Sequence, residues 1–98
     1  MYKKKPIFVT FEGIEGSGKS YQCKKLYKNL KKRGLDPILT REPGGSPSAE
    51  KIRRLILNGP KDKFSKTTDT LLYLAARNEH LEKKLIPSIK KKKIVICD

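Results

Sequence analysis

Residues 13–20 have the pattern of a phosphate-binding loop. They read GIEGSGKS and match G-x-x-x-x-G-K-[ST] in full, with an apolar run before them and a helical pattern after them. Glycines let the backbone close around an anion, so that N–H groups and the positive end of the next helix face the phosphates. The lysine adds charge near the β- and γ-phosphates, and the last hydroxyl can ligate Mg²⁺. The pattern predicts an ATP-type phosphate site formed by Gly13, Ile14, Glu15, Gly16, Ser17, Gly18, Lys19 and Ser20.

A carboxylate stands at the end of a second apolar run. Asp98 directly follows residues 94–97, which read IVIC. Proteins with a phosphate loop often place a carboxylate at such a strand end, where it coordinates a metal or water. We therefore expect Asp98 to act with Lys19 in catalysis and to bind Mg²⁺ beside Ser20, directly or through water. GTPases, ATPases and small-molecule kinases share this loop, so it leaves the phosphate acceptor open.

Three short apolar runs predict the strands that position these groups. Residues 7–11 form a short apolar, β-branched run that ends near Gly13, which predicts a strand buried on both faces of a parallel sheet. Residues 37–40 and 94–97 predict two more strands. The connections between them are long enough for parallel pairing, so we expect an α/β fold with the ligand site beyond the strand C-termini.

Helical patterns fill the connections. Residues 19–33 carry apolar residues at helical spacing and stop at Gly34, and a second helix begins with a Ser46 cap and Pro47 and ends before Gly59-Pro60. A third begins near Thr68, with a break or bend expected near Pro87. The residues expected to face the core are Cys23, Leu26, Tyr27 and Leu30 in the first helix, Ile52, Leu55 and Ile56 in the second, and Leu71, Leu72, Ala75 and Ala76 in the third.

Charge and composition restrict the partners. The net charge is +14, from 24 Lys and Arg against 10 Asp and Glu, which favours polyanions such as nucleotides. Much of the excess is lysine on predicted helix faces and ends, as on a solvated surface. No aromatic residues interleave with these charges in a recognised binding motif, so we do not expect nucleic acid as a partner.

Cysteine usage and hydropathy indicate the compartment. Cys23 and Cys97 lie far apart without a second Cys or His at metal-ligand spacing, which predicts neither a zinc site nor a disulfide. No apolar run reaches the roughly 18 residues of a membrane span, and the N-terminus lacks a signal-peptide pattern. We therefore expect a cytoplasmic protein with no membrane partner.

Four segments together resemble the thymidylate kinase family, bacterial type. In that family's order the chain carries FEGIEGSGKS at 11–20, TREPGG at 40–45, LYLAAR at 72–77 and IVICD at 94–98, and TREPGG is the most specific of these. The resemblance covers the family's N-terminal half. It implies a P-loop NTPase fold, a single kinase domain over residues 1–98 that is incomplete at its C-terminus, and transfer of the γ-phosphoryl group of MgATP to dTMP.

The resemblance also implies roles for individual residues. Glu15 is implied as a catalytic residue near the metal, which it binds through water, and near the acceptor's sugar hydroxyl. A carboxylate beside two nucleotides is unfavourable unless it holds a cation or accepts a hydrogen bond. For each residue an ordinary role stays open: a solvated loop glutamate for Glu15, surface charge for the arginines, core packing for the tyrosine. The implied acceptor site consists of Arg41, Glu42 and Arg53 around the phosphate and sugar, Pro43 in a sharp turn with a cis bond in question, Tyr73 against the thymine and Arg77 at its edge.

Further implications concern what a longer chain would add. The family's lid, adenine-contacting segment and later substrate-binding helices lie beyond Asp98, so we expect residues 1–98 alone to be inactive. Some members carry a catalytic arginine within the phosphate loop, but Gly16 occupies that position here, which implies an arginine from the lid. Members commonly form homodimers. Two alternatives stay open: another small-molecule P-loop kinase, and a basic nucleic-acid-binding fragment with a vestigial loop.

Overall fold

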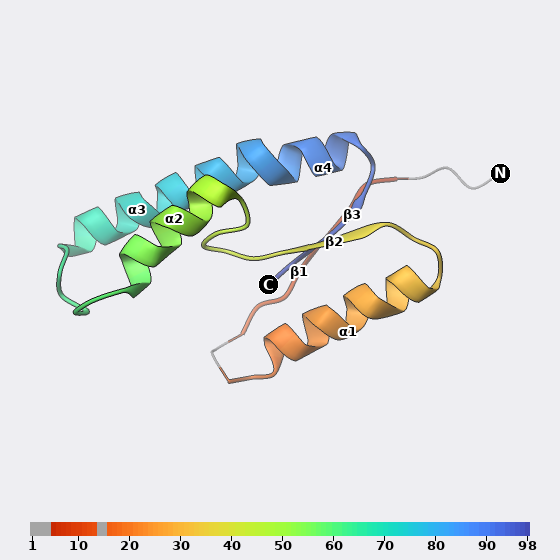
Figure 1. Ribbon diagram of the computed structural model, residues 1–98, viewed down its shortest axis with the longest axis horizontal. Helices are drawn as coiled ribbons and strands as arrows, with labels where there is room; N and C mark the ends of the chain where they lie inside the picture. The colour runs from red at the N-terminus through yellow and green to blue at the C-terminus, as the bar shows by residue number, and fades with distance from the viewer. Residues whose placement is uncertain (1–4, 14–15) are drawn as a thin grey trace. The chain divides into compact units, whose positions relative to one another are not determined.

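The chain alternates strands and helices as the sequence predicts (Figure 1). The computed structural model describes residues 5–13 and 16–98. These group into two compact units, residues 1–41 with 86–98 (the sheet unit) and residues 42–85 (the helical unit). A single domain over residues 1–98 stays a prediction. The elements in chain order are β1 (Ile7–Thr10), α1 (Lys19–Lys32), β2 (Pro37–Thr40), α2 (Pro47–Leu57), α3 (Lys66–His80), the π-helical η1 (Leu81–Leu85), α4 (Ile86–Lys90) and β3 (Ile94–Cys97).

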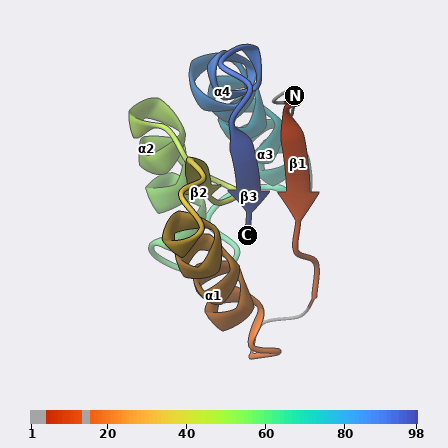
Figure 2. The same cartoon turned by 90° about the vertical axis from the view of Figure 1, so that its right-hand side faces the viewer.

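A three-stranded parallel sheet forms the sheet unit. Its order is β1-β3-β2, so the last strand lies between the first two. The register pairs Ile94 with both Ile7 and Pro37, which brings all three C-terminal ends to one edge. Figure 2 shows the arrows of β1 and β3 pointing the same way, with the chain leaving β1 toward α1. The predicted strands and their parallel pairing are confirmed, with β1 one residue shorter than expected.

The core of the sheet unit lies around the central strand. Val95 and Ile96 of β3 are fully buried, and α1 packs against β2 and β3 with Cys23 inside. The prediction that the first strand is buried on both faces is wrong, because Ile7 is 43% and Phe8 45% exposed. β1 is an edge strand with one neighbour among the described strands, so part of its apolar surface has nothing to pack against.

In the helical unit α2 packs against α3. The predicted start of α2 is confirmed: Ser46 is the N-cap, Pro47 is the first helical residue, and the Ser46 hydroxyl accepts a hydrogen bond from the Ala49 N–H at 3.2 Å. Ala49 is fully buried. The expected stripe is wrong for Leu55, which is 53% exposed, because a different side of α2, the one that carries Ala49, is buried.

The third helix starts two residues earlier than expected. Ser65 is its N-cap and accepts a hydrogen bond from the Thr68 N–H at 3.1 Å. Ala76 and His80 are fully buried and one turn apart, whereas Leu71 is 60% exposed and Ala75 is also exposed. The predicted face is therefore wrong for Leu71 and Ala75. Adjacent apolar residues point about 100° apart on a helix, so only packing decides which of each pair turns inward.

The helical path does not break at Pro87. The π-helical η1 precedes it, and α4 then runs through Pro87 to Lys90. A proline lacks the N–H that would bond back one turn, and a local change to π geometry is one way in which a helix accommodates it. The predicted bend at Pro87 is therefore replaced by a change of helix type just before it. Among residues 5–13 and 16–98, no helix has the length and apolar character needed to cross a membrane.

Candidate active site

The described residues of the phosphate loop lie between the end of β1 and the start of α1. Gly18 is the N-cap of α1 with φ 82°, a left-handed conformation that glycine adopts without strain. The first turn of this helix contains no acidic residue of its own, and the positive end of a helix favours an anion. Ile14 and Glu15 lie outside the described residues, and the roles expected for them stay predictions.

Three predicted residues come together at the C-terminal edge of the sheet. The Ser20 hydroxyl donates to Asp98 Oδ2 at 2.6 Å, and Lys19 Nζ lies 3.3 Å from Asp98 Oδ1. The Asp98 N–H donates to the Thr40 carbonyl at 2.9 Å, which extends the ladder between β2 and β3 by one bond. Asp98 is thus fixed by its backbone as well as its side chain. Lys19 and Asp98 keep 30% and 20% of their side chains exposed, so a ligand can reach both.

Charges around Asp98 keep it ionised. Burial raises the pKa of Asp98, but the hydrogen bonds from Ser20 and Lys19 and the positive charges of Lys19 and Arg41 outweigh burial and lower it below the ordinary 3.8. The positive charge of Arg41, a residue expected at the acceptor phosphate, therefore helps to lower the pKa of Asp98 in the sheet unit. Behind this group, burial and then the Asp98 charge raise the pKa of the Cys23 thiol, which keeps it protonated.

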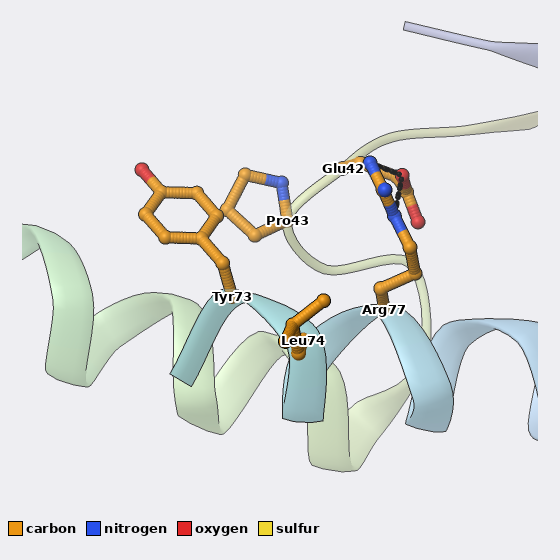
Figure 3. A pocket seen from close by; sticks show the side chains of 5 residues that line it. All are labelled: Glu42, Pro43, Tyr73, Leu74 and Arg77. Atoms are coloured by element: carbon orange, nitrogen blue, oxygen red, sulfur yellow. Dashed lines mark hydrogen bonds and ion pairs between the residues drawn. The ribbon is translucent and has the colours of Figure 1, made fainter. Parts of the chain in front are cut away.

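A second group of predicted residues lies in the helical unit. Glu42, Pro43, Tyr73, Leu74 and Arg77 line a pocket of about 220 Å³ (Figure 3). The Glu42-Pro43 bond is cis. Tyr73 is 46% exposed, so it is not the core residue that its place in an apolar helix allowed. The pocket is smaller than the roughly 300–1,000 Å³ of sites for drug-sized ligands, and it suits one planar ring.

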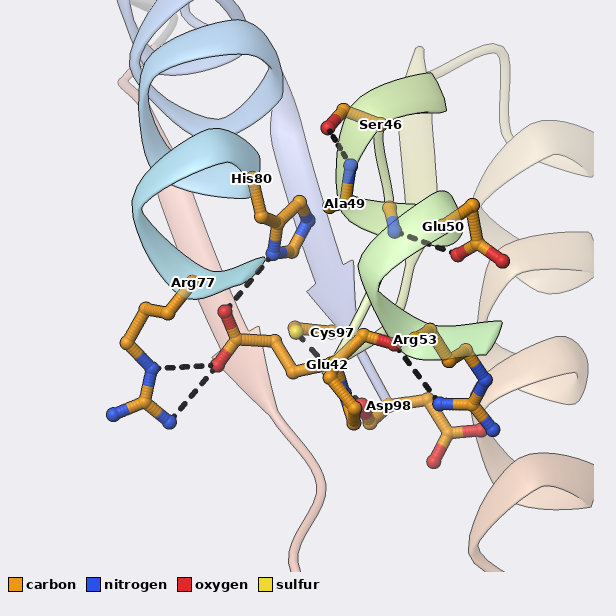
Figure 4. A network of polar contacts seen from close by, with 11 residues as sticks. Glu42, Ser46, Ala49, Glu50, Arg53, Arg77, His80, Cys97 and Asp98 are labelled. Atoms are coloured by element: carbon orange, nitrogen blue, oxygen red, sulfur yellow. Dashed lines mark hydrogen bonds and ion pairs between the residues drawn. The ribbon is translucent and has the colours of Figure 1, made fainter. Parts of the chain in front are cut away.

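Both carboxylate oxygens of Glu42 have partners from α3 (Figure 4). Arg77 Nε and Nη2 lie 3.1 and 3.0 Å from Oε1, and His80 Nδ1 lies 3.0 Å from Oε2. The sequence interpretation missed His80, which is fully buried. A signal was available, because this is the single histidine of the chain and it follows Arg77 by three residues, on the same side of the helix.

Arg53 and Glu50 hold the turn after Glu42 from the side of α2. The Arg53 guanidinium donates to the Pro43 carbonyl at 2.9 Å, and Glu50 Oε2 accepts from the Gly45 N–H at 2.8 Å (Figure 4). Gly44 has φ 136°, and a Cβ there would meet Glu50 Oε2, so this position requires glycine. Arg53, expected at the acceptor phosphate, is thus engaged with the turn, and Glu50 was missed because its role depends on a contact across the loop.

The oxygen atoms of Ser20 and Asp98 form a candidate site for Mg²⁺. Within the part of the chain that the structure describes, no three His, Cys, Asp or Glu residues gather as a metal site. Mg²⁺ needs less from a protein, because it keeps several waters and is bound through one or two carboxylates plus substrate phosphates. The Ser20 hydroxyl and Asp98 carboxylate are hard oxygen donors 2.6 Å apart and fit that requirement.

The fold and site define a P-loop nucleotide-binding protein: a parallel α/β sheet, a phosphate loop between β1 and α1, and a strand-terminal aspartate beside Lys19 and Ser20. A crystal structure of thymidylate kinase from Ehrlichia chaffeensis matches with a TM-score of 0.87 and 41% identity, over 96% of this chain and 53% of that one. The sequence model of the family described as thymidylate kinase matches residues 11–98. The chain belongs to the thymidylate kinase family.

Curated relatives agree with this assignment. The thymidylate kinase of Ruegeria pomeroyi is 53% identical over 92 residues, which cover 94% of this chain and 44% of the relative. That of Caulobacter vibrioides is 50% identical over 92 residues, with the same two shares. The predicted resemblance and P-loop fold are confirmed. The chain spans somewhat less than half the length of these relatives, all of it in their N-terminal part.

Proposed function

We propose that this chain is the N-terminal part of a kinase that transfers the γ-phosphoryl group of MgATP to dTMP, giving dTDP. The observation that carries the proposal is the contact of Lys19 and Ser20 with the ionised Asp98 at the end of β3, in a chain of this family. The lysine ammonium is poised for phosphate oxygens, and the helix start behind it favours their negative charge. Such a site acts by positioning and by neutralising charge, without a covalent intermediate.

Ser20 and Asp98 are the residues that would hold Mg²⁺, with Glu15 as a further ligand through water. The Ser20 oxygen can bind a cation through a lone pair while its O–H still donates to Asp98 Oδ2, so the observed hydrogen bond is compatible with the metal role. When bound, the ion would neutralise charge on the β- and γ-phosphates. Asp98 keeps its charge for this purpose because its pKa is lowered.

The pocket on α3 would take the base of the acceptor. Tyr73 offers a half-exposed ring for stacking, and Arg77 offers donors to a base carbonyl. Arg53 would supply charge for the acceptor phosphate, because its guanidinium keeps further N–H donors beside the one that bonds the Pro43 carbonyl. For Arg41 the same role stays a prediction from the family resemblance. A Tyr73→Ala variant of an enzyme extended to the relatives' length should raise the dTMP KM by several-fold, the loss of a contact of about 1 kcal/mol. Tyr73→Phe should leave it unchanged.

The test of the function is an acceptor panel assayed with the extended enzyme. With MgATP, dTMP should give a much higher kcat/KM than UMP or AMP. Equal use of UMP or AMP would favour the alternative of another small-molecule kinase. For the nucleic-acid alternative, ATP binding is titrated with and without Mg²⁺ at two salt concentrations: kinase-type binding depends on the metal, whereas polyanion binding falls steeply with salt. A cytoplasmic location and a homodimer stay predictions from the family resemblance.

A further inference from the structure

A single carboxylate in the helical unit joins a buried histidine to an exposed arginine. His80 is 0% exposed, the Glu42 side chain 25% and the Arg77 side chain 67%. The three groups thus lead from the interior of the unit to the wall of the pocket, and Glu42 and Arg77 line it. Figure 4 shows the two α3 side chains approaching the same carboxylate from one face of the helix. His80 is not a lining residue, and its hydrogen bond to Glu42 connects it to the pocket wall.

The direction of each hydrogen bond follows from the chemistry of the carboxylate. An ionised carboxylate only accepts, so His80 must carry a proton on Nδ1 and donate it to Oε2. Arg77 Nε donates to the other oxygen, Oε1, and Arg77 Nη2 forms an ion pair with the same oxygen. A buried imidazole has few rotamers open to it in a packed interior, and its bond therefore fixes the plane of the Glu42 carboxylate.

Arg77 depends on that fixed plane. A long, mostly exposed arginine loses much rotamer entropy when held in one place, and exposed ion pairs alone hold such side chains weakly. Here the Nε and Nη2 edge is turned toward Glu42, which leaves the Nη1 nitrogen for a pocket ligand. If the Glu42 carboxylate rotates, the Nε and Nη2 edge of Arg77 moves with it. The orientation of Arg77 is therefore set by His80, through Glu42.

We propose that His80 is a positioning residue for the acceptor: it fixes Glu42, which aims Arg77 at the base carbonyl of a pyrimidine nucleotide in the pocket. This inference rests on the proposed function. It also assigns Glu42 to holding Arg77, in place of a direct contact with the acceptor's sugar or phosphate. A purely structural His80 would stabilise the fold without any connection to Arg77, and the two possibilities differ in a measurable way.

The experiment is a double-mutant cycle on the enzyme extended to the relatives' length. The variants are His80→Leu, Arg77→Ala and the combination, with Asn78→Leu as a control at an exposed position of the same helix. For each, the KM for dTMP, the KM for ATP, kcat and Tm are measured. His80→Leu should raise the dTMP KM about tenfold, the order expected for losing a hydrogen bond to a charged group, with the ATP KM unchanged. Asn78→Leu should change neither.

Non-additivity is the decisive readout. Once Arg77 is alanine, His80→Leu should raise the dTMP KM no further, because the group it positions is gone. His80→Asn, which keeps an N–H donor near the Nδ1 position, should restore most of the lost dTMP affinity. Equal effects of His80→Leu with and without Arg77, or equal increases in the KM for ATP and dTMP, would overturn the positioning role.

A second variant covers the case in which His80→Leu does not fold. Glu42→Gln keeps the shape of the side chain but removes the charge that holds Arg77, so it should raise the dTMP KM by a larger factor than the ATP KM. An unchanged dTMP KM in Glu42→Gln would contradict the proposal. Failure of the wild-type enzyme to use dTMP would overturn the proposed function and this inference together, whereas additive variants in an enzyme that uses dTMP would overturn this inference alone.

Discussion

Lys19 forms an ion pair with Asp98, and a phosphate ligand would have to share the lysine ammonium with that carboxylate. In the described chain its ammonium lies 3.3 Å from Asp98 Oδ1, and Ser20 occupies the other carboxylate oxygen. The lysine thus lies at the start of α1 with its ammonium beside the carboxylate that ends β3. Preorganised charge of this kind is what stabilises a transferring phosphoryl group, because little rearrangement is needed at the moment of reaction.

Replacing Lys19 by Met tests this charge. In the extended enzyme, Lys19→Met should lower kcat by roughly 10²–10³-fold or more, the size seen when one preorganised donor to a transition state is removed. Lys24→Met, at an exposed position of the same helix, is the control and should leave kcat within about twofold. Steady-state turnover of dTMP measures both. Retained turnover in Lys19→Met would contradict the role of the loop.

The lowered pKa of Asp98 predicts a pH-dependent contribution to stability. A carboxyl with a folded-state pKa below its unfolded value stabilises the protein fully above the unfolded value, near 3.8, and this stability is lost as the pH falls through the folded pKa. Asp98→Asn should therefore lower the free energy of unfolding by about 1 kcal/mol at pH 7 without nucleotide. The difference should shrink below about pH 4. Urea unfolding across pH 3–7 measures it, and a difference independent of pH would contradict the assignment.

At the scale of elements, the N-termini of α1 and α2 lie next to the two groups of predicted site residues. α1 begins at the phosphate loop. α2 begins where the turn after Glu42 ends, and Ser46 caps it. Ser46 is only 4% exposed, whereas the equivalent cap of α3, Ser65, is exposed. Water can replace a lost hydroxyl at an exposed cap more easily than at a buried one. The two caps therefore differ in what their removal should do.

Ser46→Ala should destabilise the extended enzyme by about 1–2 kcal/mol, toward the upper end for N-caps, because the Ala49 N–H loses its partner in a buried place. Ser65→Ala makes the matched comparison, since its hydroxyl accepts from the Thr68 N–H at 3.1 Å in an exposed place. A loss of about 0.5 kcal/mol is expected there. Denaturant unfolding of both variants checks the difference, and a larger loss for Ser65→Ala would be inconsistent with it.

At the scale of the whole molecule, the chain holds the phosphate-loop group and the pocket beside Tyr73 and Arg77, and it spans 44% of the Ruegeria pomeroyi relative. We expect residues 1–98 alone to give no measurable turnover with MgATP and dTMP. A transferring phosphoryl group needs further positive charge beside Lys19, and the loop carries Gly16 where some members have arginine. The apolar edge strand β1, with Phe8 45% exposed, should also make this chain prone to aggregate. Assaying it beside the extended enzyme tests both points, and comparable turnover would contradict the first.

The sequence by itself determined the features that depend on neighbouring residues. The bounds of β2 and β3, the phosphate loop and the Ser46-Pro47 start of α2 follow from local patterns of apolar residues, glycine and caps, and the four family segments led to the family. Such signals need no partner from elsewhere in the chain, because backbone conformation and capping act within a few residues.

Only the tertiary structure decided which surfaces meet. It turned Ala76 inward and Leu71 outward, left Ile7 exposed on an edge strand, and brought Glu42 to His80 across 38 positions of sequence. A carboxylate that accepts from a buried imidazole cannot be told from a solvated one by its neighbours, because the partner is fixed by packing between elements. His80 escaped the sequence interpretation for this reason, and Asp98 did not, because a strand end marks its place in any parallel sheet that carries a phosphate loop.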